Sequence, residues 1–566
     1  MINLRQIPYG EANFEAIIKE NCIYVDKTMY IEKLEANPNR RKTIYLRPRR
    51  FGKSLFTSML TNYYSVDTAN KFENLFKGLY IYENPTPNKN NYYVLNFNFS
   101  GMTIMGNNIN EEGKSEFCNK VRNGIKSFIN KYNLKLEAKG DSPAQILDNL
   151  LVDFQGLNLN NKIYIIVDEY DNFTNAILKG DAQDFLELVN RNGYVRAFYE
   201  VIKEKLEIGT IERFFATGVM PVTLDNLTSG FNIATNLSTN PEFASMIGFT
   251  HEEVKEIVKE VVPEYDVEKV YEDLKSNYDG YRFSEESEEK TFNSTLVMYY
   301  LSNYSTNKKA PRELMDVNMN TSGDKIQRMV ELVNPEKNYK LIEQILLNNK
   351  VDGTLKQVVL DKNYTTDDLL TMLFHLGYIT IKEIGMNISF TIPNYITSTI
   401  YSEYLANLLK RREEYQIDAS RITTAIVNLG ERGNINSIVE IIKDFLKHSS
   451  TRDLENFNEK NLKHLFAMFL SLSKQYEVYG EFPAGQGFAD ILVRKTSSSM
   501  AKYEAVIELK YLSKQNARKS NKKKLIKEAK EQLARYIEDK RLNQRVNLKK
   551  YVIIFIGFEE VILEEI

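Results

Sequence analysis

The stretch RPRRFGKS at residues 47–54 follows a short apolar run, residues 43–46, and precedes a helical pattern. The apolar run predicts a β-strand, so the stretch is expected to form a loop between a strand and a helix. Such a loop can bind phosphate, because unpaired N–H groups at the N-terminus of a helix attract anionic oxygens. The stretch therefore predicts a phosphate-binding loop at the start of an α/β domain.

Four residues of this loop are expected to bind ATP: Arg49, Gly52, Lys53 and Ser54. In the P-loop motif G-x-x-x-x-G-K-[ST], the lysine reaches the β- and γ-phosphates and the hydroxyl joins the shell of a Mg²⁺ ion. Arg47 replaces the first glycine of that motif. Because a Gly-Lys-Ser string alone is common, the assignment depends on finding the acidic partner of the loop.

An acidic pair, Asp168 and Glu169, ends a second apolar run at residues 163–167. In ATPases of this design the aspartate holds Mg²⁺ and the glutamate polarises the attacking water. A third predicted strand, residues 213–216, ends at Thr217. Thr217 is placed like the polar sensor beside the acidic strand, and an ordinary Thr-Gly turn is the alternative interpretation.

A second constellation lies near the C-terminus, where Asp490 lies in one predicted strand, residues 489–493, and Glu508 and Lys510 lie at the end of another, residues 503–509. Side chains at i and i+2 point to the same face of a strand, so Glu508 and Lys510 are expected to lie together. Two carboxylates and a lysine at one sheet edge can hold Mg²⁺ beside a water or a phosphate. This is the minimum equipment for phosphodiester hydrolysis.

Two further residues are candidates for this centre. Glu481 precedes Asp490 and is a candidate metal ligand or orienting group. Gln532 shares one face of a predicted helix with residues 528 and 536, from which it could touch the centre or the DNA backbone. The residues expected to hold Mg²⁺ at the two centres are Ser54, Asp168, Glu481, Asp490 and Glu508.

Composition limits the classes of protein to which the chain can belong. At 566 residues it is too long for a single core, and 43% hydrophobic with 27% charged residues is ordinary for a soluble globular protein. The net charge of -2 provides no global basic field for nucleic acid. DNA contact would have to come from basic patches at residues 40–53 and 510–530, for which a solvated surface is the alternative interpretation.

Other families of protein are excluded by what the sequence lacks. Two cysteines cannot form a disulfide framework, and four scattered histidines give no zinc pattern. The N-terminus does not resemble a signal peptide, and no apolar run approaches the ~18 residues that cross a bilayer. We therefore expect a cytoplasmic protein with no membrane contact.

The pattern of elements predicts an α/β protein with four regions. Residues 1–240 alternate strands and helices, which predicts a P-loop ATPase domain with a mainly parallel sheet. Residues 241–395 are helical and include a helix at residues 367–376 followed by a hairpin, a candidate winged helix that could bind DNA or act as a plain linker. Residues 396–473 predict a helical linker, and residues 474–566 predict a restriction-endonuclease-like α/β domain.

The chain resembles a bacterial family of AAA-ATPase-like proteins with a C-terminal PD-(D/E)xK nuclease domain. The resemblance covers nearly the whole chain and rests on motifs at residues 7–10, 24–28, 47–54, 168–171, 217–219, 278–281, 377–378, 392–394 and 481–510. An arginine at the position of Arg47 is usual in that family. The resemblance implies nucleotide binding at residues 52–54 and nuclease chemistry at Asp490, Glu508 and Lys510.

Three hypotheses about function follow. The first is a protein that binds and hydrolyses ATP and cleaves DNA phosphodiester bonds with Mg²⁺ in its C-terminal domain. The second is a nucleotide-switched protein that binds DNA or a partner through a non-catalytic nuclease fold. The third is a regulator or scaffold whose ATP site drives oligomerisation, and a homo-oligomer is compatible with each of the three.

Overall fold

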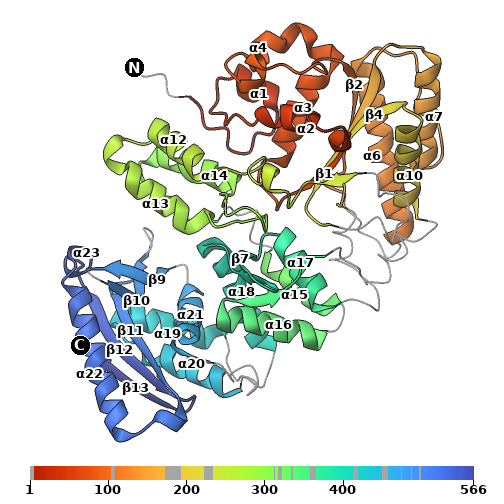
Figure 1. The fold of residues 1–566 in the computed structure, drawn as a ribbon. Helices are drawn as coiled ribbons and strands as arrows, with labels where there is room; N and C mark the ends of the chain where they lie inside the picture. Colours follow the sequence, from red (N-terminus) through yellow and green to blue (C-terminus); the bar gives the residue numbers. More distant parts are fainter. Residues whose placement is uncertain are drawn as a thin grey trace. The chain divides into compact units, whose positions relative to one another are not determined.

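The computed structural model describes the chain except for residues 1–4, 103–108, 173–192, 222–233, 312, 316–321, 333–334, 357–364, 412–418, 449–456, 473–474, 486 and 496–498. The chain forms two compact units (Figure 1). The first unit comprises Met1–Lys309, Arg328–Pro335 and Asp352–Pro393, and the second comprises Ala310–Gln327, Glu336–Val351 and Asn394–Ile566. No helix of the described residues is long and apolar enough to span a membrane.

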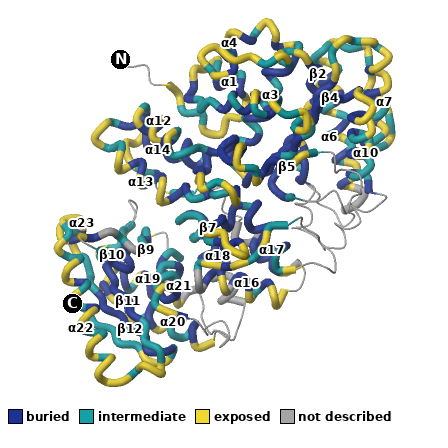
Figure 2. The backbone as a smooth tube through the Cα atoms, viewed as in Figure 1, coloured by how far each residue is buried: buried dark blue, intermediate teal, exposed yellow. Residues whose placement is uncertain are grey.

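The first unit is built on a five-stranded sheet with the order β2-β3-β4-β1-β5. Its strands are β1 (Lys42–Leu46), β2 (Tyr92–Asn98), β3 (Lys162–Asp168), β4 (Ile211–Gly218) and β5 (Thr235–Asn236). Neighbouring strands all pair in parallel. The predicted parallel sheet is confirmed, and the interior positions of its central strands are buried (Figure 2).

Helices connect and cover these strands. α6 (Ile109–Lys131), α7 (Pro143–Gly156) and α10 (Tyr194–Glu207) pack on one another beside the sheet (Figure 1). The other helices within the first unit are α1 (Phe14–Lys19), α2 (Met29–Glu35), α3 (Lys53–Tyr64), α4 (Phe72–Phe76), α5 (Tyr80–Glu83), α12 (His251–Val261), α13 (Val267–Tyr278), α14 (Ser294–Asn307) and α17 (Thr366–His375). Two more, α15 (Ser322–Leu332) and α16 (Pro335–Asn348), include residues of both units.

The predicted helix and hairpin of the middle region are present as α17, β7 (Thr380–Ile384) and β8 (Ile388–Thr391). Together with β6 (Val351–Gly353) the hairpin forms a three-stranded sheet of order β6-β8-β7. Every residue of α17 from its third position to its end, residues 368–375, is buried. A recognition helix must offer an exposed face to a DNA groove, so α17 does not fit the DNA-binding role considered for the candidate winged helix.

The second unit begins with helices and ends in a mixed sheet of order β13-β12-β11-β10-β9. Its helices are α18 (Tyr395–Arg411), α19 (Ala419–Arg432), α20 (Asn436–His448), α21 (Glu459–Ser471), α22 (Lys519–Ile537) and α23 (Lys540–Asn543). Its strands are β9 (Tyr476–Ala484), β10 (Gly487–Lys495), β11 (Glu504–Leu512), β12 (Leu548–Ile556) and β13 (Glu560–Glu565). β11 and β12 pair in parallel, and the other neighbours pair antiparallel.

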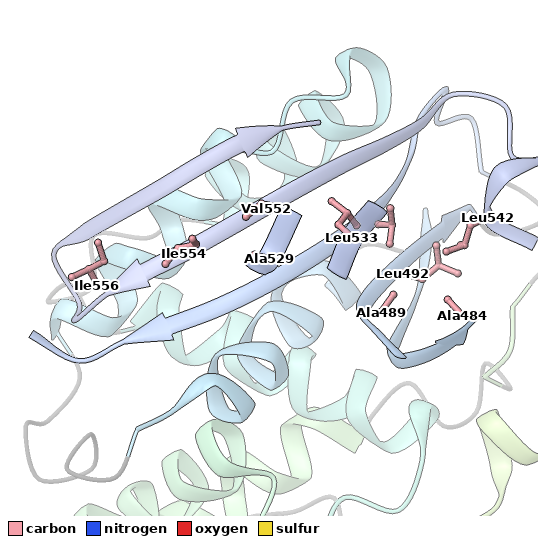
Figure 3. Close-up of a cluster of buried hydrophobic side chains, with 10 residues drawn as sticks. Ala484, Ala489, Leu492, Ala529, Leu533, Leu542, Val552, Ile554 and Ile556 are labelled. Carbon is pink, nitrogen blue, oxygen red and sulfur yellow. The ribbon is translucent and has the colours of Figure 1, made fainter. Parts of the chain in front are cut away.

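A continuous apolar layer fixes this sheet on α22. Ala529 and Leu533 of the helix lie against Leu492, Val552 and Ile554 of the sheet (Figure 3). Buried apolar area stabilises by about 25 cal/mol per Å², and the alternation of side chains along β11 and β12 points one set of residues to the helix. The layer therefore holds β10 and β11, which carry the expected nuclease residues, on a rigid support.

Arg47 connects the end of β1 with two distant segments of the first unit. Its side chain is buried and donates hydrogen bonds to the carbonyl oxygens of Ser238, at 2.7 Å, and Ala244, at 2.9 Å. Its guanidinium carbon lies 4.3 Å from the ring centre of Tyr45 and 4.2 Å from that of Phe283. Burial lowers the pKa of Arg47, so main-chain carbonyls and aromatic faces stabilise a cation in the interior.

We predict that Arg47→Met lowers the stability of the first unit by about 3 kcal/mol, because buried carbonyls would lose their donors. Melting followed by circular dichroism should show the transition of this unit at a temperature lower by roughly 6–12 °C. The exposed Arg41→Met change is the control and should melt like the wild type. Equal melting temperatures for the two variants would show that Arg47 does not have this structural role.

Candidate functional site

The backbone of the loop at residues 47–54 curves around the N-terminus of α3. Gly52 is the N-cap of α3 and has φ of 101°, and Arg50 has φ of 69°. Glycine adopts this left-handed conformation at little cost, whereas other residues do not. Successive N–H groups at the N-terminus of a helix form a concavity that binds anions. The loop therefore has the backbone geometry of a phosphate cradle.

Lys53 is held by the loop itself. Its Nζ donates to the carbonyl oxygens of Arg47, at 3.1 Å, and Pro48, at 3.2 Å. Burial lowers the pKa of Lys53, and the carboxylates of Glu169, Asp171 and Asp168 oppose that shift. The ammonium group thus lies at the centre of an acidic surrounding, bonded to neutral carbonyls that a phosphate oxygen could replace.

Ser54 and Asp168 meet as the sequence predicted. Ser54 Oγ donates to Asp168 Oδ2 at 2.6 Å. Asp168 Oδ1 is buried without a hydrogen-bond partner, and burial raises the pKa of this carboxyl. A hydroxyl, a carboxylate and an unpaired buried oxygen are the hard donors that Mg²⁺ prefers. These residues fit a Mg²⁺ ion beside the loop.

Glu169 is placed by a tight turn at the end of β3, where it has φ of 56°. The turn is fixed to the end of β4, because Asp171 Oδ2 accepts hydrogen bonds from the N–H groups of Val219, at 3.0 Å, and Met220, at 2.6 Å. Burial raises the pKa of Asp171 to about 6. A Cβ at Gly218 would lie 2.1 Å from Asp171 Oδ1, so only glycine fits there.

Of the other two residues expected at the nucleotide site, Thr217 is buried and Arg49 is exposed. Thr217 is fully buried, and its hydroxyl donates to the carbonyl oxygen of Tyr45 at 2.8 Å. It lies beside Asp168 in the strand register, but its hydroxyl bonds to β1. Arg49 is exposed, and its main-chain oxygen accepts from Asn293 Nδ2 at 3.4 Å. The sensor role of Thr217 stays a prediction.

The nuclease candidates lie where β10 and β11 separate. The recorded pairing of these strands ends at Ile491 opposite Ile507. Beyond it, Asp490 Oδ2 accepts a hydrogen bond from the N–H of Leu509 at 2.7 Å. The Asp490 carboxylate accepts the main-chain hydrogen bond that a strand partner would otherwise accept. This hydrogen bond both ends the strand pairing and fixes the position of Asp490.

Glu508 and Lys510 complete the cluster that the sequence predicted. Lys510 Nζ lies 2.7 Å from Glu508 Oε1 and 3.9 Å from Asp490 Oδ2. Burial and the neighbouring Asp490 raise the pKa of Glu508 to about 7. Glu508 Oε2 is buried without a hydrogen-bond partner. The structure therefore brings Asp490, Glu508 and Lys510 together and leaves one carboxylate oxygen unpaired.

Two residues of α21 join this cluster, and the sequence analysis missed them. Lys463 Nζ lies 2.5 Å from Asp490 Oδ1, and Glu459 Oε1 lies 3.2 Å from both Lys463 Nζ and Lys510 Nζ. α21 falls in the region predicted as a helical linker, so its residues were not considered. The one signal available in the sequence was the i, i+4 spacing of Glu459 and Lys463 after a helix-capping Asn458.

Tyr536 of α22 lies near this cluster, and Gln532 lies one helical turn before Tyr536. Gln532 Oε1 is buried without a hydrogen-bond partner. The pKa of Tyr536 is raised by burial and by the charges of Glu508 and Asp490, which places its hydroxyl within reach of their field. Glu481 belongs to β9, and its side chain lies outside the described residues. Its role as a ligand stays a prediction.

The side chains of this cluster include oxygen donors that could coordinate a divalent cation. Within the described ranges, no group of three or more His, Cys, Asp or Glu side chains is arranged to hold a metal ion. Lys463 and Lys510 instead neutralise the carboxylates of Asp490 and Glu508. Two carboxylates with one unpaired oxygen fit Mg²⁺, which usually takes one or two protein carboxylates and completes its shell with water.

The basic run near α22 is largely neutralised by acidic partners. Its ion pairs are Lys514 with Glu559, Lys522 with Glu560, Lys524 with Glu528, Lys527 with Glu531 and Lys530 with Glu564. Pairing reduces the positive potential that a phosphate backbone would meet. The solvated-surface interpretation of this run is therefore favoured over that of a continuous DNA-binding patch.

Comparisons with known proteins support the two domains in which these residues lie. Residues 8–228 match the family described as predicted AAA-ATPase, and residues 457–565 match the PD-(D/E)XK nuclease superfamily. The chain joins an AAA-ATPase-like domain to a PD-(D/E)XK nuclease superfamily domain. The suspected architecture is thereby confirmed. The second match begins just before α21, so the matched range includes Glu459 and Lys463.

Similarity to individual proteins is weaker. An uncharacterized protein in the vnfD 5′ region of Azotobacter chroococcum mcd 1 is 24% identical over 294 residues, which are 52% of this chain and 52% of that protein. The chain thus spans about half the length of this curated relative. Its similarity says nothing about activity, because that protein is itself uncharacterized.

Two archaeal structures share a limited likeness with the chain. Cdc6p from Pyrobaculum aerophilum has a TM-score of 0.26 and 12% identity, covering 71% of this chain and 96% of that one. The ORC2 protein of Aeropyrum pernix, in ADPNP–ADP complexes, has a TM-score of 0.28 and 11% identity, covering 70% and 93%. Both TM-scores are too low to support a conclusion about this chain.

We predict that replacing Lys522, Lys523 and Lys524 together by glutamine changes the salt dependence of DNA binding by about one unit of slope, not three. Lys522 and Lys524 are already paired with carboxylates, whereas Lys523 is exposed. Affinity for a DNA duplex would be measured by fluorescence anisotropy at several salt concentrations. The Lys523→Gln variant should account for most of the change, and a loss of three units would show that the ion pairs open on binding.

Proposed function

We propose that the AAA-ATPase-like domain binds and hydrolyses ATP with Mg²⁺, and that the nuclease-like domain cleaves DNA phosphodiester bonds in a Mg²⁺-dependent reaction. The observation that carries the proposal is the meeting of Asp490, Glu508 and Lys510 in one buried cluster, from two strands, with an unpaired carboxylate oxygen. The matching observation for ATP is the hydrogen bond from Ser54 to Asp168 at the start of α3.

In the ATP reaction, each residue has a separate task. The N–H groups at the start of α3 and the ammonium group of Lys53 bind the phosphates. Ser54 and Asp168 would hold a Mg²⁺ ion, which would offset the negative charge of the phosphate oxygens. Glu169, fixed by the turn at the end of β3, orients and polarises the attacking water.

In DNA cleavage, Asp490 and Glu508 would hold the Mg²⁺ ion, which supplies charge neutralisation and activates water. Lys510 donates to the attacking water or to a phosphate oxygen and stabilises the charge that develops there. To do so it must leave Glu508, its partner at 2.7 Å. Glu459 then remains close to Lys510 and can hold the displaced ammonium group in position.

A second candidate is a nucleotide-switched protein that uses the nuclease fold only to bind DNA or a partner. It is favoured by one observation, the internal neutralisation of the carboxylates by Lys463 and Lys510. A binding fold could keep such ion pairs for stability alone. The two proposals differ in one outcome, since only the first requires metal-dependent turnover. A cytoplasmic location and a homo-oligomeric state accompany both proposals as predictions.

For the ATP site we predict that Lys53→Ala abolishes nucleotide binding, because the phosphates lose their principal cation. Glu169→Gln should bind ATP with nearly the wild-type affinity and hydrolyse it at least ~10²-fold more slowly, because it cannot polarise the water. Calorimetry gives the binding constant and phosphate release gives the rate. Wild-type affinity in a folded Lys53→Ala variant would mean that the loop is not the nucleotide site.

For the nuclease site we predict that Asp490→Ala, Glu508→Ala and Lys510→Ala each reduce cleavage by roughly 10³-fold or more, and that double variants are no worse than single ones, because the residues act as one unit. ATP hydrolysis should be retained. Cleavage of plasmid DNA with Mg²⁺ or Mn²⁺, with EDTA as the blank, provides the measurement.

The exposed Glu531→Ala change on α22 is the matched control for these variants and should cleave like the wild type. Circular dichroism would establish that each variant is folded. Full cleavage by any folded single variant of the cluster would remove that residue from the proposed centre. A wild-type protein that binds DNA without cleaving it would favour the second candidate.

A further inference from the structure

The outer side of the phosphate loop is covered by residues far along the chain. The ring of Phe51 lies 5.0 Å from that of Tyr281 and 5.6 Å from that of Phe283, measured between ring centres. The main-chain oxygen of Arg50 accepts a hydrogen bond from the N–H of Thr295 at 3.1 Å. The loop is therefore supported from behind by residues 281–295, which lie outside the sheet that carries it.

A further contact joins Pro48 to Gly377, which lies two residues after the end of α17. A Cβ at Gly377 would lie 2.9 Å from Pro48 Cγ and 3.0 Å from Pro48 Cβ. Gly377 has φ of +79° and its N–H bonds to the carbonyl oxygen of Phe374 at 2.9 Å. The side chain of Pro48 is a rigid ring, and Gly377 contributes only backbone. Neither residue could therefore move away from an added Cβ without a cost in free energy.

A second path runs from α17 to the loop through aromatic rings. Phe374 of α17 contacts Phe283, with 6.0 Å between ring centres. The guanidinium group of Arg47 stacks on the ring of Phe283. The next residue, His375, is buried, and burial together with the nearby Arg47 lowers its pKa to about 3. An uncharged imidazole is thus kept beside a buried cation, within the packing that supports the loop.

These contacts account for motifs that neither proposed reaction uses. A Cβ at Gly280 would lie 2.3 Å from the carbonyl oxygen of Pro393, so the motif at residues 278–281 packs directly on the motif at residues 392–394. Tyr281 of the first of these motifs contacts both Phe51 and the Cβ position of Gly377. Three motifs from distant parts of the sequence therefore converge behind the phosphate loop.

We propose that α17 and the turn at Gly377 form a positioning element of the nucleotide site, acting through the contact between Gly377 and Pro48. The element holds the loop in the shape that receives the phosphates. Its helix is buried along residues 368–375, which suits an internal support. By thermodynamic reciprocity, nucleotide at the loop and any change in this element affect each other equally. The proposal rests on the proposed ATP binding of the same loop.

The test compares two glycines with the same backbone strain and different surroundings. Gly377 has φ of +79° and Gly209 has φ of +80°, but a Cβ at Gly209 would meet nothing within 4 Å. Both alanine variants should lose similar stability from the strained backbone. Only Gly377→Ala also pushes on Pro48, so we expect its Kd for Mg²⁺-ATP to rise at least ~10-fold while that of Gly209→Ala stays within about twofold.

A double-mutant cycle separates positioning from simple loss of structure. Pro48→Gly removes both ring atoms that a Cβ at residue 377 would meet. In the Gly377→Ala background it should recover most of the lost affinity, although alone it weakens binding or leaves it unchanged. Contacting residues show this kind of non-additivity, whereas independent ones do not. Kd would be measured by calorimetry on protein that circular dichroism shows to be folded.

Each result decides between definite alternatives. Equal affinities for the Gly377→Ala and Gly209→Ala variants, or additive effects in the cycle, would overturn the positioning role while leaving ATP binding intact. A wild-type protein that binds no nucleotide would overturn both this inference and the proposed ATP function. Recovery of affinity in the double variant supports the inference, since a defect caused by backbone strain at Gly377 alone would not be relieved by removing the ring of Pro48.

Discussion

The buried guanidinium group of Arg47 is the interaction on which the first unit depends most. It bonds to the main chain at Ser238 and Ala244 and lies between the rings of Tyr45 and Phe283. Removing a cation from water is costly unless hydrogen bonds and aromatic faces stabilise it, so these segments must be in place together. The side chain points into the interior rather than toward the phosphates. This explains how an arginine can stand where the P-loop motif has glycine and leave the cradle at residues 50–54 intact.

Much of both sites could be predicted because their residues are set by local geometry. Asp168 ends a buried strand, and Glu508 and Lys510 lie two positions apart on another, so strand periodicity alone places them. Glu459 and Lys463 could not be predicted in this way, since their approach to Asp490 depends on how α21 packs on the sheet. Two strands of the C-terminal sheet were also missed. β9 contains Gly480 and Pro483, which weaken a strand pattern, and β13 has only three apolar residues, 561–563, between glutamates at the edge of the sheet.

Two interpretations that looked functional in the sequence depend on tertiary contacts that a sequence does not display. The helix and hairpin at residues 366–391 have the pattern of a winged helix, but α17 is buried and packs against other parts of the protein. The lysines of α22 form a basic run, but β13 supplies Glu560 and Glu564 opposite two of them. In both cases the local pattern predicted the element correctly, but it did not show which residues from other parts of the chain would contact that element. Exposure and charge pairing, not periodicity, decide whether such elements can meet DNA.

The resting state of the nuclease-like centre follows from its own ion pairs. Glu459, Asp490 and Glu508 would repel one another if they stood alone in a buried site, and Lys463 and Lys510 remove most of that repulsion. The domain can therefore fold and persist before any metal arrives. In the metal-dependent reaction proposed above, a divalent ion would have to compete with the two ammonium groups that are already in place. The proposed centre would then be dormant when free divalent cations are scarce.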